Sequence, residues 1–244
     1  MRRLVLALVA ALVVVAALVA IKAATDEPAS HARPGDASTG HVHALIAFVG
    51  DSNLVFGMSQ LDEALDLGLS GYVTVDASAT GATIRWNGCY FISGVPCPDV
   101  AYPDYWKVKV GELRKRSEPD VYVVDLGIND ALNPGRETSP GYGHYGAKID
   151  WMMRLLPAAK PVLWTNLPCA VEPADTRTGC ASINAELAAA RARWKNLTVL
   201  DWAAKADAHP EYMQHPKIAT VHYTSAGYDA YAALVADAIK SKAP

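Results

Sequence analysis

One serine lies where an α/β protein readily places a nucleophile. The apolar run 45–49 predicts a buried strand, and it ends at Gly50-Asp51-Ser52-Asn53. Ser52 would then lie between the carboxyl end of a strand and the next helix, where open α/β sheets bind ligands. Backbone N–H groups at a helix N-terminus stabilise negative charge, so an oxyanion beside Ser52 would find donors. The competing interpretation is a plain Asp or Ser helix cap.

Two further polar sites follow in the chain. Gly127-Ile128-Asn129-Asp130 comes directly after the apolar run 121–126, and His222 precedes a helical pattern near the C-terminus. This ordered set of GDS, GxND and a late histidine resembles the SGNH (GDSL-type) hydrolase family, from about Ala44 to the end of the chain. Each short motif alone would be weak evidence. Their order, each after a predicted strand, carries the resemblance.

The resemblance implies a serine hydrolase that needs no cofactor or metal. Ser52 would be the nucleophile and His222 its general base. The oxyanion hole would consist of the Ser52 N–H, the N–H of Gly81 and the side-chain amide of Asn129. By residue type alone, Gly81 and Asn129 could equally be turn residues. Asp130 is expected to order its loop by accepting backbone N–H bonds.

The chain departs from the family pattern at the triad acid. Family members usually carry an Asp three residues before the catalytic His, and that position here is Ala219. An acid holds the imidazole tautomer and stabilises the imidazolium. A backbone carbonyl near Ala219 could replace it and leave a Ser52–His222 dyad. Alternatively a carboxylate from elsewhere could fold in, or the domain could bind without catalysis. The candidate carboxylates are Asp207, Glu211 and Asp201.

Strands alternating with helices must position these residues. We expect strands at 45–49, 72–76, 121–126, 162–165 and 197–200. We expect helices at 53–67, 105–115, from 145, at 181–194 and after the Thr224 cap. This order predicts a doubly wound, mostly parallel five-stranded sheet flanked by helices. The resemblance implies a flavodoxin-like three-layer sandwich.

Composition sets the broad class. The chain has 244 residues, 51% of them hydrophobic, which is ample for one domain with a real core. The net charge is only −3 and no basic run occurs, so we expect no nucleic-acid partner. His41 and His43 could form a metal pair, but no third ligand is near in sequence, and we expect no metal site there.

The N-terminus predicts export. Residues 1–23 combine two early arginines with a long apolar run, which fits a signal peptide or an uncleaved membrane anchor. Residues 24–40 are small, polar and contain Pro and Gly, which predicts a flexible linker to a domain at 41–244. The domain would be extracytoplasmic, either secreted or held at the membrane by the N-terminal segment.

Export favours disulfides for the even number of cysteines. The chain has four: Cys89, Cys97, Cys169 and Cys180. Three connectivities are open, and the local pairing Cys89–Cys97 with Cys169–Cys180 is preferred because each pair brackets a Pro/Gly-containing loop. No CxxC spacing supports a zinc site.

Three functions fit these residues. The first is a serine esterase acting on short acyl or acetyl esters of envelope glycans or lipids, inferred from export and the resemblance. The second is an O-acyltransferase that uses the same residues with a sugar hydroxyl in place of water. The third is a non-catalytic envelope-binding domain, which only the missing acid supports.

Overall fold

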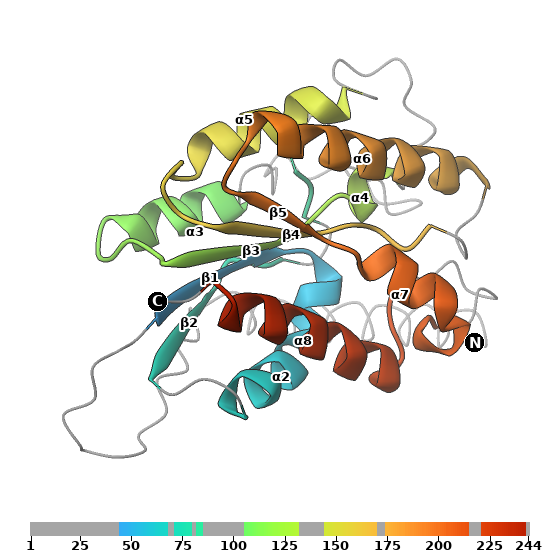
Figure 1. The fold of residues 1–244 in the computed structure, drawn as a ribbon, viewed down its shortest axis with the longest axis horizontal. Helices are drawn as coiled ribbons and strands as arrows, with labels where there is room; N and C mark the ends of the chain where they lie inside the picture. The colour runs from blue at the N-terminus through green and yellow to red at the C-terminus, as the bar shows by residue number, and fades with distance from the viewer. Residues whose placement is uncertain are drawn as a thin grey trace, which may run out of the picture.

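The computed structural model (Figure 1) describes residues 44–67, 71–79, 82–84, 105–131, 144–169, 174–214 and 221–242. Several predictions lie outside these residues: the segments 1–23 and 24–40, His41 and His43, Gly81, the Cys89–Cys97 pair and Ala219. In the described part of the chain, no helix combines the length and apolar character needed to span a membrane.

Five strands form one parallel sheet in the order β2-β1-β3-β4-β5. This order places the first strand in the sheet interior, as in flavodoxin-like folds. The predicted doubly wound α/β architecture is therefore confirmed. The strands are β1 (Ala44–Gly50), β2 (Tyr72–Asp76), β3 (Val121–Asp125), β4 (Val162–Thr165) and β5 (Leu197–Leu200).

Helices cover both faces of the sheet, giving three layers (Figure 1). One face carries α3 (Tyr105–Arg114), α4 (Ile128–Ala131), α5 (Tyr145–Leu155) and α6 (Ala174–Arg193). The other carries α2 (Ser52–Asp66), α7 (Trp202–Ala208) and α8 (Ser225–Lys240), with a short 3-10 turn at Pro210–Tyr212.

Strand residues alternate between two hydrophobic clusters. In β1, Ile46 and Phe48 pack with the α2 and α8 side, whereas Ala47 and Val49 pack with the α3, α5 and α6 side. Both faces of β1 are thus buried, because a parallel strand covered by helices on each side has no solvent face. This explains the uninterrupted apolar run in the sequence.

Four helical segments differ from the prediction: α6, α7, and the short α4 and 3-10 turn, which lie where no helix was predicted. α6 begins at Ala174, seven residues before the predicted start, so Cys180 lies inside a helix and not in a loop. α7 was not predicted, because only Trp202 and Ala206 are buried in it, too few to give a periodic pattern. Elsewhere the predicted elements are present within two residues of their bounds.

Candidate active site

Ser52 and His222 are brought together although 170 residues separate them. Ser52 Oγ lies 2.8 Å from His222 Nε2. In the tautomer that carries its proton on Nδ1, the imidazole accepts a hydrogen bond from the serine hydroxyl. Ser52 is buried and His222 is half-buried, so solvent reaches part of the imidazole but little of the serine side chain. A hydroxyl in this position can lose its proton to the imidazole.

The turn between β1 and α2 fixes Ser52. Asp51 is the N-cap of α2, and its Oδ1 accepts a hydrogen bond of 3.0 Å from the Asn53 N–H. A Cβ at Gly50 would lie 2.6 Å from the Leu54 side chain, so only glycine allows the helix to start this close to the strand. Ser52 is thereby the first helical residue. The cap interpretation was correct for Asp51, and it leaves the Ser52 hydroxyl available.

Asn129 reaches the same edge of the sheet from the neighbouring strand. β1 and β3 pair so that Gly50 lies opposite Asp125, and their carboxyl ends therefore coincide. Gly127 has a φ of +135°, a conformation that favours glycine, and it turns the chain into α4. The buried Asn129 Nδ2 donates to Asp51 Oδ2 at 3.2 Å and to the Ala82 carbonyl at 3.0 Å.

Asp130 anchors the loop that carries Asn129. Its Oδ2 accepts the Ile84 N–H at 2.9 Å, as predicted, and its Oδ1 accepts from Lys148 Nζ at 2.9 Å. The Asp130 side chain is 1% exposed and the Lys148 side chain 10%, so this is a buried ion pair between α4 and α5. Burial raises the pKa of Asp130, and the Lys148 charge opposes that rise.

Two acidic side chains, Asp51 and Asp125, are buried at the ends of β1 and β3 beside Ser52. Burial, with the nearby Asp125 charge, raises the pKa of Asp51 well above its usual value. Burial likewise raises the pKa of Asp125 to about 6, although its Oδ1 accepts a hydrogen bond from Thr165 Oγ1. The Asn129 amide thus donates to a carboxyl group, that of Asp51, whose pKa is raised by burial.

Main-chain hydrogen bonds hold the His222 segment, and one aromatic ring lies beside its imidazole. Its carbonyl accepts the Gln214 N–H at 2.9 Å, and Tyr223 forms an antiparallel bridge with Met213. Thr224 caps α8 through its Oγ1, as predicted. The Phe56 ring lies edge-on to the imidazole, with centroids 5.1 Å apart. Burial lowers the His222 pKa below its ordinary value, which keeps the imidazole neutral.

The three candidate acids are engaged elsewhere or exposed. Asp201 caps α7 and accepts from Asn166 Nδ2, and Glu211 accepts from His209 Nδ1. Asp207 is exposed on α7. Over the ranges that the structure describes, no carboxylate hydrogen-bonds to His222. The residues immediately before Val221, where a backbone carbonyl was predicted to serve, lie outside those ranges.

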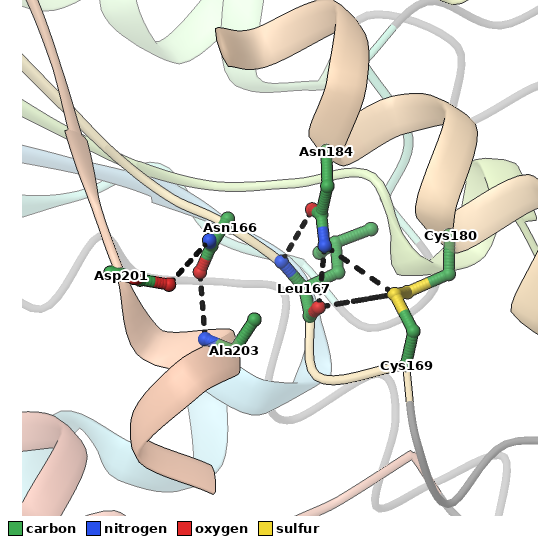
Figure 2. The surroundings of a disulfide bond; sticks show 7 residues. All are labelled: Asn166, Leu167, Cys169, Cys180, Asn184, Asp201 and Ala203. Carbon is green, nitrogen blue, oxygen red and sulfur yellow. Dashed lines mark hydrogen bonds between the residues drawn. A yellow bond between two sulfur atoms is a disulfide. The ribbon is translucent and has the colours of Figure 1, made fainter. Parts of the chain in front are cut away.

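A disulfide braces the loop after β4, beside the same sheet edge (Figure 2). The predicted Cys169–Cys180 pairing is confirmed. Asn184 of α6 clamps the Leu167 backbone, accepting from its N–H and donating to its carbonyl, each at 2.8 Å. Asn166 donates to Asp201 and accepts from the Ala203 N–H. Residues 166–169 are therefore fixed to α6 and α7.

The side chains at this edge of the sheet were predicted from the sequence, but some of the residues that hold them in place were not. Ser52, Asn129 and His222 all lie at the carboxyl edge of β1 and β3, as expected. The link from Asn129 to Asp51 and the role of Lys148 were not predicted. Asp51 could have been found from its place in the GDS turn. The role of Lys148 could not be predicted from the sequence, because its partner Asp130 is 18 residues away.

Comparisons with known proteins agree with this arrangement. A profile of the GDSL-like lipase/acylhydrolase family matches residues 48–230, three quarters of the chain. No curated protein sequence is significantly similar to the chain.

Several solved structures share the fold. The lipase/acylhydrolase from Enterococcus faecalis superposes with a TM-score of 0.60 at 17% identity, covering 82% of this chain and 97% of that one. The C-terminal catalytic domain of peptidoglycan O-acetyltransferase A from Streptococcus pneumoniae gives 0.54 at 17% identity, covering 83% and 93%. The aryl esterase of M. smegmatis gives 0.58 at 13% identity, covering 82% and 99%. With the matched motifs and this fold, the chain belongs to the GDSL-like lipase/acylhydrolase family.

Proposed function

We propose that the protein is a serine esterase in which Ser52 is the nucleophile and His222 the general base. The observation that carries this proposal is the 2.8 Å contact between Ser52 Oγ and His222 Nε2. A nucleophile and its base within hydrogen-bonding distance are what acyl transfer through serine requires. A domain that only binds would have no need for this pairing.

The proposed reaction has two stages, acylation of Ser52 and release of the acyl group by water. His222 takes the Ser52 proton as the hydroxyl oxygen attacks the ester carbonyl. The imidazolium then gives that proton to the departing alcohol, which leaves an acyl group on Ser52. Water, activated by the same imidazole, releases the acyl group as a carboxylic acid and restores the serine.

Negative charge on the carbonyl oxygen needs donors at the moment of attack. We propose three donors for this role: the Ser52 N–H at the start of α2, the Asn129 side-chain amide and the N–H of Gly81. Asn129 would exchange its longer bond, 3.2 Å to Asp51, for the oxyanion. One such donor is typically worth about 3–4 kcal/mol in the transition state.

We infer short acyl or acetyl esters on envelope glycans or lipids as substrates, with the domain outside the cell. The residues 1–23 support export, and family membership supports ester chemistry. O-acyl transfer to a sugar hydroxyl is the second candidate, because one structure of the same fold is the catalytic domain of a peptidoglycan O-acetyltransferase.

A product assay tests both candidates. The whole chain is incubated with phenyl acetate, with and without a glycan acceptor, and free acetate and acetylated glycan are quantified. Release of acetate by the wild type but not by Ser52→Ala supports the esterase. Transfer exceeding hydrolysis would favour the acyltransferase. Neither product from correctly folded wild type would contradict the proposed catalysis.

A further inference from the structure

Two exposed apolar residues lie beside the candidate active site. Val55 and Phe56 follow Ser52 by three and four residues, which places them one helical turn along α2. Their exposed fractions are 36% and 51%. Only Leu67 and Val108 are other large hydrophobic residues exposed to this degree in the described ranges. Half of these exposed side chains are therefore adjacent to the nucleophile.

Phe56 does not contribute to the packing of α2 against the hydrophobic core. α2 buries Leu54, Leu61 and Leu65, and it packs closely on α8 where Gly57 meets Tyr228. Phe56 instead reaches the His222 imidazole edge-on, at a centroid distance of 5.1 Å and an interplanar angle of 78°. Part of its ring contacts the imidazole, and about half of the side chain remains exposed to solvent.

The imidazole marks the side of the site that receives the alcohol. His222 must give its proton to the departing alcohol oxygen, so that oxygen lies within hydrogen-bonding reach of Nε2. In the proposed mechanism the carbonyl oxygen is bound by the Asn129 amide and not by the imidazole. A group attached to the alcohol oxygen therefore extends along the imidazole, beside which the exposed Phe56 ring lies.

We propose that Phe56, with Val55, is the contact surface for the alcohol part of the ester and selects alcohols with an apolar face. This inference rests on the proposed esterase function and adds the class of the alcohol to it. Burying an apolar face on an exposed ring is favourable because it removes hydrocarbon from water. The acyl group lies away from Phe56 and gains nothing from it.

The test separates the alcohol from the acyl group. For Phe56→Ala, Phe56→Leu and the wild type, kcat/KM is measured on the acetates of methanol, butanol and phenol. The same is done on methyl acetate, propionate and butyrate. Each variant is compared with the wild type on the same substrate, which cancels differences in intrinsic ester reactivity. Leu67→Ala, exposed at the far end of α2, is the matched control.

We expect Phe56→Ala to lower kcat/KM about tenfold for butyl and phenyl acetate and less than about twofold for methyl acetate. The loss should appear mainly in KM, and Phe56→Leu should retain most of the activity on butyl acetate. Leu67→Ala should match the wild type. An equal loss on all three alcohols, as expected if Phe56 only holds the imidazole, would overturn the inference.

A loss that followed acyl length would also overturn it, because Phe56 would then lie on the acyl side. Failure of the proposed function looks different: the wild type itself would hydrolyse none of the five esters. The two failures can therefore be told apart in one set of assays.

Discussion

The candidate site has two halves that differ in what holds their side chains. We call Ser52 and Asn129 the nucleophile half and His222 the imidazole half. Around Ser52 and Asn129, side-chain hydrogen bonds join Asp51, Asn129 and the backbone of Asn53 and Ala82. The adjacent Asp130–Lys148 ion pair is buried. Around His222, the described contacts are one hydroxyl, one aromatic ring and main-chain bonds to the 211–214 segment.

This difference matches what the proposed mechanism requires of each half. Oxyanion donors must be in place before charge develops, so a network of fixed polar groups suits them. In the same mechanism the imidazole exchanges protons with two partners in turn, and main-chain bonds hold its segment without fixing its charge. If this comparison is right, the two halves respond differently to substitution and to pH.

The largest expected effect comes from removing the imidazole of His222. His222→Ala removes the base that takes the Ser52 proton, and we expect kcat for phenyl acetate to fall by at least about 10³-fold. The fold should persist, because the side chain is only half-buried. Steady-state hydrolysis measures the loss, and circular dichroism checks the fold. Activity within tenfold of the wild type would remove His222 from the mechanism.

The next largest effect is on the stability of the nucleophile half, through the buried Asp130–Lys148 ion pair. Lys148→Met leaves the Asp130 carboxylate buried without its cation, and removal of one partner of a buried pair typically costs about 3–5 kcal/mol. We expect a corresponding fall in the free energy of unfolding, measured by urea denaturation. The matched control is Lys148→Met with Asp130→Asn, which removes both charges and should recover most of the stability. An unchanged midpoint in the single variant would mean that the pair is not holding the loop.

The pH dependence sharpens the comparison. Burial lowers the His222 pKa, so the imidazole stays neutral to lower pH than an ordinary histidine. Activity should be full above that pKa and be lost as pH falls through it, giving kcat/KM an acid midpoint below about 6.5. A midpoint above that value would indicate a carboxylate beside the imidazole.

Asp125 is a second titratable group near Ser52 and needs its own control. Burial raises the pKa of Asp125 to about 6. Asp125 lies opposite Gly50 at the end of β3, next to the turn that carries Ser52. Asp125→Asn should leave the acid midpoint of kcat/KM unchanged if His222 sets it. A shift of the midpoint in this variant would assign the pH dependence to the carboxyl group instead.

The smallest expected effects concern the candidate acids. Asp207→Asn and Glu211→Gln should each keep kcat/KM within about twofold of the wild type, because both side chains are exposed and Glu211 pairs with His209. The same esterase assay measures both. A loss of about 10²-fold or more in either variant would show that its carboxylate reaches His222 during catalysis.

The sequence predicted the parts of the site that follow strands. Ser52 and Asn129 come directly after apolar runs, and carboxyl ends of neighbouring parallel strands share one edge. The Lys148 ion pair and the Asp51–Asn129 bond were beyond reach, because they join residues 18 and 78 positions apart without a periodic pattern. The Phe56 contact was missed for the same reason, since its partner is on the segment before α8.

Covalent labelling of Ser52 tests the central claim most directly. The whole chain is treated with a fluorophosphonate probe, and the modified peptide is identified by mass spectrometry. A serine activated by His222 predicts one adduct, on the peptide that contains Ser52, and no adduct in Ser52→Ala. Equal labelling of wild type and Ser52→Ala would contradict the account.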